Sequence, residues 1–256
     1  MKLPELQKHS RYGYQLLYLS QKYAQFNLSE QELLNRLGKF KLCIIGAGAI
    51  GSFIAAMGAA VGIGTIRMID GDIVEESNLT RQIFYKESDI GNKAKVNSIR
   101  DFVCAFNSSV VFEAVDHFVE DDSQTLKDFD GMNLIIQTAD QPVGVIDEIV
   151  ANNAQKVNVL SVYVHSGTFG PFIVPNETKT FSDFEASIDE STNGLYTKFI
   201  HNVDPRSRTA FPAIANGALS MSAFIFDKII EFAISKDIPE LRNYYWLEKN
   251  RTYVEF

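Results

Sequence analysis

The chain has 256 residues, of which 46% are hydrophobic, and its 32 acidic and 24 basic residues give a formal charge of −8. No basic run could follow a phosphate backbone, which argues against nucleic acid as a partner. No segment reaches the roughly 18 to 20 apolar residues that a membrane helix needs, and the first residues lack a signal-peptide pattern. We therefore expect a cytoplasmic protein that does not enter a membrane.

The first predicted elements are a helix, a strand, a glycine-rich helix and a second strand. Ser29 and Glu32 form a capping-box pattern for a helix that is expected to end near a left-handed Gly38. The apolar run 40–45 (FKLCII) is bounded by glycine, which is typical of a strand buried on both faces of a parallel sheet. A small-residue helix is predicted after GAGAIG, and 65–70 (TIRMID) is predicted to be a strand.

The alternation of strands and helices continues to about residue 174. Helices are expected at 93–107, 123–129 and 142–155, and strands at 110–114, 132–139, 157–164 and 168–174. This βαβ pattern predicts an α/β fold with a doubly wound, mostly parallel Rossmann-type sheet.

The last third of the chain breaks this rhythm. Residues 176–210 are polar without a sustained period, so we interpret them as a long crossover loop. A helix is predicted at 213–235, and the tail suggests a C-terminal hairpin. The predicted organisation is a helical extension at 1–38, too short to fold alone, and a nucleotide-binding domain at 39–256.

Gly46, Gly48 and Gly51 lie in GAGAIG, between a predicted strand and a predicted helix. The first glycine permits a tight turn, the second lets a phosphate approach the backbone, and the third lets helix and strand pack closely. Asp70 ends the next strand, 19 residues after Gly51, where a carboxylate can accept hydrogen bonds from ribose. NAD and ATP both fit this pattern, and glycines that serve packing alone remain the alternative.

The polar segment after the second strand favours ATP. Asn78, Arg81 and Gln82 place two amides and a guanidinium in a loop, and Lys93 and Lys95 follow at the start of a helix. Cations near a glycine-rich turn suit a triphosphate, because they offset its charge and stabilise the charge that develops on departing pyrophosphate.

Asp140 follows the apolar strand MNLIIQTA, at the edge of an open α/β sheet where ligands bind. A carboxylate there can hold Mg²⁺ beside nucleotide phosphates. The alternative is a helix N-cap, because Pro142 suits the first turn of the helix that follows.

The strings GAGAIG, IDGD, SNLTRQ, IG-x-x-x-K and TAD, in this order within residues 11–175, resemble the ThiF family, the bacterial relatives of ubiquitin-activating enzymes. The resemblance implies an adenylation domain at 39–256, with ATP and Mg²⁺ as its cofactors. It implies ribose contacts from Asp70 with help from Asp72, and phosphate contacts from Asn78, Arg81, Gln82 and Lys95. It also implies that Asp140 holds Mg²⁺. Lys93 is an alternative to Lys95 as the phosphate-binding lysine, because the IG-x-x-x-K element has one residue more than the usual spacing.

Several family features are missing. Zinc-binding C-x-x-C pairs would fall at 176–183 and in the C-terminal region, which contain no cysteine, so no zinc is expected. The chain's two cysteines, Cys43 and Cys104, are interpreted as core residues, and no thioester is expected because 176–210 has no cysteine either. His165 and His201 are interpreted as structural.

Arg11 and Tyr14 stand where the family has two arginines, the second of which reaches the neighbouring subunit. The missing second arginine weakens the expectation of a contact across subunits. Residues 138–175 most resemble the microcin-C maturation branch of the family, which adenylates a ribosomal peptide.

The sequence therefore predicts a homodimeric adenylyltransferase that activates the C-terminal carboxylate of a peptide or ubiquitin-like carrier protein. The alternatives are a non-catalytic scaffold of the same fold that recruits a peptide, and an NAD-dependent oxidoreductase.

Overall fold

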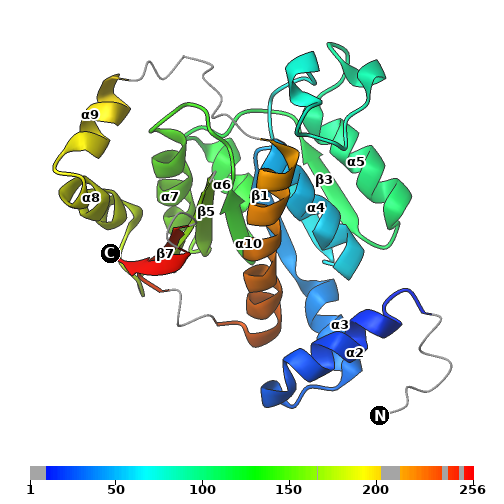
Figure 1. Cartoon of the computed structure of the whole chain (residues 1–256). Coiled ribbons are helices and arrows are strands. Elements are labelled where there is room, and N and C mark those ends of the chain that lie inside the picture. Colours follow the sequence, from blue (N-terminus) through cyan, green and yellow to red (C-terminus); the bar gives the residue numbers. More distant parts are fainter. Residues whose placement is uncertain (1–9, 166, 203–213, 238–241, 248–250) are drawn as a thin grey trace.

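The computed structural model describes residues 10–165, 167–202, 214–237, 242–247 and 251–256, and it contains one mixed sheet between layers of helices (Figure 1). The sheet has eight strands in the order β3-β2-β1-β4-β5-β6-β7-β8. Neighbours from β3 to β5 pair in parallel, and β6, β7 and β8 are added antiparallel. The predicted doubly wound, mostly parallel sheet and its C-terminal hairpin are thus confirmed.

The strands are short and follow the expected positions, except that the strand expected at 157–164 begins only at Ser161. They are β1 (Lys41–Ile45), β2 (Thr65–Ile69), β3 (Val111–Val115), β4 (Leu134–Gln137), β5 (Ser161–His165), β6 (Thr168–Ile173), β7 (Tyr244–Leu247) and β8 (Thr252–Glu255). The helices are α2 (Gly13–Lys22), α3 (Glu30–Lys39), α4 (Ala49–Val61), α5 (Lys95–Phe106), α6 (Ser123–Phe129), α7 (Ile146–Lys156), α8 (Phe181–Ser191), α9 (Leu195–Asn202) and α10 (Ala215–Ser235).

Strand β1 shows why both faces of the sheet are covered. Its buried residues alternate between two hydrophobic clusters, with Leu42 and Ile44 in one and Cys43 and Ile45 in the other. The first cluster includes residues of α2, α3, α4, α5 and α10, and the second includes residues of α6, α7 and α8. Successive strand side chains point to opposite faces, so a continuous apolar run needs a helical layer on each side.

The capping box of α3 is confirmed. The Ser29 hydroxyl accepts from the Glu32 backbone N–H, and the Glu32 carboxylate accepts from the Ser29 backbone N–H. The expected left-handed Gly38 is wrong, because α3 continues to Lys39. The Leu37 carbonyl accepts from the Phe40 and Gly64 backbone N–H groups, so this helix end is satisfied without a left-handed residue.

The interpretation of 176–210 as a loop is wrong for 181–202, where α8 and α9 lie. Thr180 begins α8 with a second capping box, in which its hydroxyl accepts from the Asp183 backbone N–H. Phe181 and Phe184 then pack into the second cluster, near Tyr163 and Phe256. Burial of this apolar stripe stabilises a helix whose exposed face is polar.

Other helices differ from the prediction at their first residues or in what they bury. Helix α5 begins at Lys95 and α7 at Ile146, two and four residues later than expected. Cys43 is buried as expected, whereas Cys104 is exposed on α5, so its assignment to the core is wrong. None of the described helices is long and apolar enough to cross a membrane.

Candidate functional site

The glycine-rich turn joins β1 to α4 at the edge where the parallel strands end. Gly46 has a φ of +95°, a backbone conformation that residues other than glycine rarely adopt. A Cβ on Gly51 would lie 2.0 Å from the Gly46 carbonyl oxygen, so the third glycine lets α4 pack against the turn. Gly48 is the N-cap of α4, and a Cβ there would meet no described atom within 4 Å. The N-terminus of α4 therefore faces open space at its second glycine.

The backbone of Ala47, between these glycines, is held from two sides. Its N–H donates to Asp70 Oδ2 at 2.7 Å, and its carbonyl accepts from the hydroxyl of buried Tyr85. Asp70 Oδ1 accepts from the Asp72 backbone N–H at 2.8 Å. Burial raises the pKa of Asp70, although the Lys95 charge and both backbone hydrogen bonds oppose this change. The glycine turn and the end of β2 thus form one rigid unit.

The two competing lysines lie in different places. Lys95 has a side chain that is 10% exposed, and its Nζ lies 2.8 Å from Asp72 Oδ2. Lys93 instead extends to Asp101 Oδ2 at 2.6 Å, on the exposed side of α5. Lys95 is therefore the lysine that pairs with Asp72, and its charge also acts on Asp70.

The loop between β2 and α5 carries the three remaining predicted phosphate contacts. Asn78 is buried, and its Oδ1 accepts from the Glu75 backbone N–H, which closes a turn. Arg81 Nη1 donates to the Ser77 carbonyl at 2.8 Å. Gln82 is buried, and its Oε1 has no hydrogen-bond partner among the described residues.

This loop is docked on the glycine turn and on α4. The Tyr85 hydroxyl donates to the Ala47 carbonyl, and the centroids of the Phe84 ring and the Phe53 ring of α4 are 5.3 Å apart. The loop is therefore adjacent to the N-terminal half of α4, although no described contact joins Arg81 or Gln82 to the glycines.

The end of β4 reaches the same turn. Thr138 Oγ1 donates to the Ile45 carbonyl at 2.8 Å, and a Cβ on Gly46 would lie 2.9 Å from the Ala139 nitrogen. Asp140 follows and is half-buried. Helix α7 has Val145 as its N-cap, so capping of α7 by Asp140 is wrong. No group of three or more His, Cys, Asp or Glu side chains gathers as a metal site in the described part of the chain.

A series of polar contacts joins Gln137, Asp147 and His165, near Asp140. Gln137 Nε2 donates to Asp147 Oδ1 at 2.9 Å, and Asp147 Oδ2 lies 3.2 Å from His165 Nε2. Burial lowers the pKa of His165, but Asp147 and the charge of Asp140 outweigh this and raise it overall. The side chain of His201, the other histidine singled out from the sequence, lies outside the described residues.

Phe118 is an aromatic residue at this edge that the sequence did not indicate. It follows β3, it is 61% exposed, and a Cβ on Gly71 would lie 2.9 Å from its Cδ2. Gly71 separates Asp70 from Asp72, so an exposed ring lies against the backbone between these two residues. Tyr85 and Phe118 lie in segments without a distinctive motif, and only their tertiary contacts reveal them.

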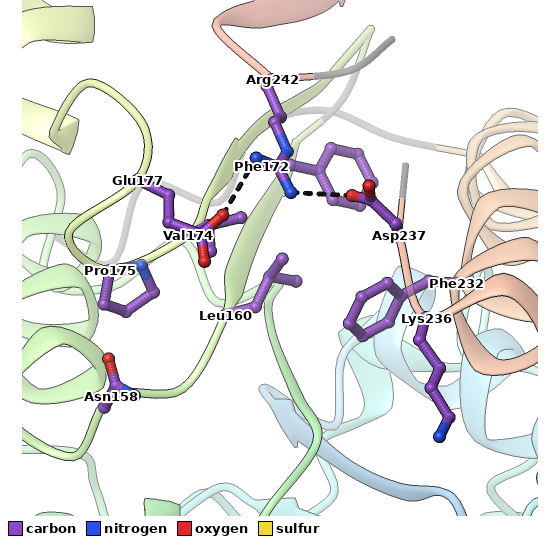
Figure 2. Close-up of a pocket in the computed structure, with 10 residues that line it drawn as sticks. All are labelled: Asn158, Leu160, Phe172, Val174, Pro175, Glu177, Phe232, Lys236, Asp237 and Arg242. Carbon is purple, nitrogen blue, oxygen red and sulfur yellow. Dashed lines mark hydrogen bonds and ion pairs between the residues drawn. The ribbon is translucent and has the colours of Figure 1, made fainter. Parts of the chain in front are cut away.

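The cavity in Figure 2 lies elsewhere, near the start of β5 and the end of β6, and measures about 220 Å³. Arg242 lies at this cavity and binds the carboxylates of Glu177 and Asp237 at 2.9 and 2.8 Å. A second cavity, of about 500 Å³, is lined by residues of α3 and α10 that include Arg36 and Phe232. None of the predicted site residues lines either cavity.

Comparison with protein families gives a match to the model described as "ThiF family" over residues 19–250. The adenylyltransferase and sulfurtransferase uba4 of Emericella nidulans is 33% identical over 138 residues, which are 53% of this chain and 26% of that protein. The probable adenylyltransferase/sulfurtransferase MoeZ of Mycobacterium tuberculosis is 42% identical over 72 residues, 28% of this chain and 18% of that protein. The matched part of the chain thus spans 26% and 18% of these two curated relatives.

Two solved structures share the fold along nearly the whole chain. The crystal structure of PaaA has a TM-score of 0.77 at 24% identity and covers 100% of this chain and 84% of its own. E. coli MccB, solved with AMPCPP and MccA, has a TM-score of 0.76 at 23% identity and covers 99% and 73%. At these identities the likeness concerns the fold.

Proposed function

Because the chain belongs to the ThiF family, we propose that it is an ATP-dependent adenylyltransferase. Its substrate would be the C-terminal carboxylate of a ribosomal peptide or a ubiquitin-like carrier protein, converted to an acyl-adenylate. The observation that carries the proposal is the unit formed by the glycine turn, Asp70 and the Lys95–Asp72 pair. The adenylyltransferase names of the curated relatives, and the solved complex of MccB with AMPCPP and MccA, support it.

The proposed nucleotide position follows from these contacts. The N-terminus of α4 offers unpaired backbone N–H groups and partial positive charge, and the open space at Gly48 leaves room for phosphates. Asp70 would accept from the ribose, because each carboxylate oxygen has a second lone pair beyond its backbone hydrogen bond. Phe118, beside Gly71, would pack against the adenine base.

In the proposed reaction, a carboxylate oxygen of the substrate attacks the α-phosphorus, and the bond from that phosphorus to pyrophosphate breaks. Pyrophosphate leaves with the bonding electrons, so the negative charge on it grows. Lys95 and Arg81 would offset this charge, with Asn78 and Gln82 contributing amides, and in-line displacement needs little else beyond positioning.

Magnesium belongs to this proposal through Asp140. A half-buried carboxylate just after β4, with no ion pair or hydrogen bond among the described residues, is the kind of oxygen ligand that Mg²⁺ prefers. This one carboxylate suits the ion, which would neutralise phosphate charge when bound.

Neither cysteine suits a thioester intermediate. Cys43 is fully buried in β1, where burial raises the pKa of its thiol. Cys104 lies in the last turn of α5, at the opposite end of that helix from Lys95 and the proposed nucleotide site. We propose that the acyl-adenylate is released or reacts with a nucleophile other than cysteine. The proposal also includes a cytoplasmic location and a homodimer. Sedimentation of the purified protein tests whether it is a dimer.

Arg81→Ala tests the ATP site without knowledge of the acyl substrate. Mg·ATP should protect the wild-type protein from thermal unfolding while NADH does not, because a ligand that binds only the folded state stabilises it. Loss of a charge-assisted contact to phosphate should weaken ATP binding roughly ten- to hundredfold. Arg100→Ala is the matched control, since Arg100 is exposed and contacts Asn97 and Asp101 on α5. Equal ATP affinity in wild type and Arg81→Ala would contradict the proposed role of the loop.

A further inference from the structure

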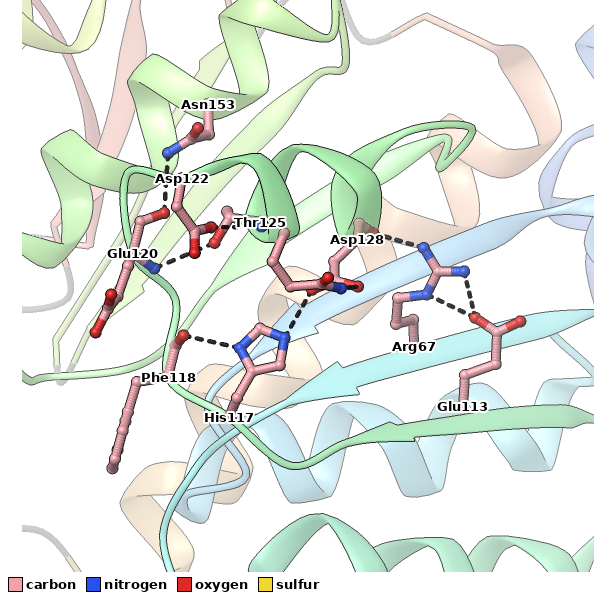
Figure 3. A network of polar contacts seen from close by, with 10 residues as sticks. Arg67, Glu113, His117, Phe118, Glu120, Asp122, Thr125, Asp128 and Asn153 are labelled. Atoms are coloured by element: carbon pink, nitrogen blue, oxygen red, sulfur yellow. Dashed lines mark hydrogen bonds and ion pairs between the residues drawn. The ribbon is translucent and has the colours of Figure 1, made fainter.

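His117 lies between the end of β3 and α6, and both of its ring nitrogens face oxygen acceptors (Figure 3). Nδ1 lies 2.8 Å from the Phe118 carbonyl oxygen, and Nε2 lies 2.8 Å from Asp128 Oδ2. A carbonyl and a carboxylate can only accept, so both ring nitrogens must donate. The neutral imidazole has one N–H, whereas the imidazolium has two and satisfies both contacts.

The charged groups around His117 come from α6 and from the neighbouring strands. Asp128, 12% exposed, also accepts from Gln124, and its carbonyl accepts from Arg67 Nη1 at 2.6 Å. Arg67 is itself neutralised by Glu113 at 2.6 Å, and Asp122 adds negative charge near the ring. Burial lowers the pKa of His117, but the Phe118 carbonyl, Asp128 and Asp122 together raise it.

The contact with Phe118 connects this network to the proposed nucleotide site. The His117 ring is bound to the backbone of Phe118, whose side chain extends away from the network in Figure 3. That side chain packs against Gly71, between the carboxylate that would hold the ribose and the one that binds Lys95. A shift of the Phe118 backbone would therefore move the ring where the adenosine group would lie.

We propose that His117 is a positioning residue for ATP: its imidazolium joins Asp128 to the Phe118 backbone, and ATP binds more weakly once that proton is lost. The inference rests on the proposed function, because it assumes that the nucleotide lies beside Gly71.

The direction of the pH dependence follows from thermodynamic linkage. A histidine whose folded-state pKa lies above its unfolded value stabilises the fold fully below the unfolded pKa, near 6.5. That contribution disappears as the pH rises through the folded-state pKa. The Phe118 backbone is therefore held best at a pH below the folded-state pKa of His117. ATP should bind more tightly at that pH than above it.

Asp128→Asn separates the proton from the contact. An asparagine amide can donate to a neutral Nε2 while Nδ1–H still donates to Phe118, so the network no longer needs the extra proton. Binding of Mg·ATP by the full chain would be measured by calorimetry from pH 6 to 8.5 in wild type and Asp128→Asn. The ratio of their dissociation constants cancels the titration of ATP itself and that of Asp70.

The dissociation constant of Mg·ATP for the wild type, divided by that for Asp128→Asn, should be near one at pH 6. It should rise to about five at pH 8.5, as expected for the loss of one hydrogen bond. His117→Ala should bind about fivefold more weakly than wild type at pH 6. Lys156→Gln is the matched control, because it breaks the 2.5 Å ion pair of Asp121 with α7, which holds the same connection between β3 and α6. It should keep the wild-type pH profile.

Nitrogen-15 NMR of the His117 ring gives an independent readout, with both nitrogens protonated at pH 6.5 in the folded wild-type protein. A neutral ring at that pH, or a His117→Ala variant with the wild-type profile, would overturn the inference while ATP binding stands. Failure of the wild type to bind Mg·ATP at any pH would overturn the proposed function, and the inference with it.

Discussion

Lys95 brings a buried positive charge to an edge of the sheet that already holds two carboxylates. Its pairing with Asp72 compensates the cost of removing an ammonium from water in the free protein. The sequence could place a lysine here but left Lys93 and Lys95 open, because the spacing from Gly91 suits neither cleanly. Tertiary contacts place Lys95 rather than Lys93 beside the carboxylates, since the Lys95 backbone N–H donates to the Asp72 carbonyl at 2.9 Å and fixes where α5 begins.

Replacement of each lysine by methionine separates them, because methionine keeps the length of the side chain and removes the charge. Lys95→Met should weaken ATP binding roughly ten- to hundredfold, since the phosphates lose a cation and face unopposed carboxylates. Lys93→Met should change it less than about twofold, because Lys93 forms an exposed pair with Asp101. Isothermal calorimetry with Mg·ATP measures both, and the reverse order of effects would contradict the assignment of Lys95.

Phe118 and His117 show where prediction of the site from sequence ends. The position of Asp70, Asp140 and the glycines at one edge of the sheet could be predicted, because they follow buried strands and parallel strands end at the same edge. His117 and Asp128 are 11 residues apart, on either side of a turn, and no periodicity predicts that they meet. Their contact depends on how α6 packs on the sheet.

At the scale of the element, the turn from β1 to α4 gives each glycine a different task. Gly51→Ala would bring a Cβ to 2.0 Å from the Gly46 oxygen, which α4 can relieve only by moving. We expect the variant to lose about 1–3 kcal/mol or more of stability. Gly48→Ala meets no described atom, and its φ of −70° suits alanine. It should fold like the wild type and still bind Mg·ATP at least about tenfold more weakly, if phosphates occupy that space.

Urea unfolding and calorimetry on the same two proteins measure these effects separately. A Gly48→Ala protein that binds Mg·ATP normally would show that no phosphate approaches the N-cap of α4. A Gly51→Ala protein with wild-type stability would show that α4 can move without cost.

Helix α8 was missed for a local reason. The T-x-x-D spacing of Thr180 and Asp183 is a capping signal of the same kind as Ser29 and Glu32, which predict α3. The polar composition of 176–210 outweighed it, because the apolar stripe of Phe181, Phe184 and Ile188 is narrow. That stripe is buried by residues distant in sequence: Tyr163 of β5 packs against Phe181, and Tyr245 and Phe256 pack against Phe184.

At the scale of the whole molecule, the parallel half of the sheet could be predicted and the antiparallel half only in part. Right-handed crossovers fix where successive parallel strands lie, so βαβ alternation in the sequence restricts the topology. The tail suggests the hairpin of β7 and β8, but its pairing with β6 joins Thr168 to Leu247 and Phe169 to Trp246, which are 79 and 77 positions apart. No local pattern encodes that distance.

The absence of zinc is the prediction that belongs to this scale, because zinc would tie 176–183 to the C-terminal region. In this chain, side chains join the same two segments. Arg242 binds Glu177 at 2.9 Å, the Lys179 backbone N–H donates to Asn243 Oδ1 at 3.0 Å, and Lys179 Nζ donates to the Phe256 carbonyl. A metal has no structural task left there, so the purified, untagged protein should contain no stoichiometric zinc by elemental analysis, and a chelator should leave its Tm unchanged.

Asn243→Gly tests whether these contacts replace the metal. Glycine accepts the φ of 63° at this position and removes only the side-chain hydrogen bond, so stability should fall by about 0.5–1.5 kcal/mol in urea unfolding. Asn193→Gly is the matched control, because Asn193 has a φ of 53° and its side chain makes no hydrogen bond among the described residues. Tightly bound zinc, or a loss of Tm on chelation, would show instead that a metal holds these segments, and Asn243→Gly would then behave like its control.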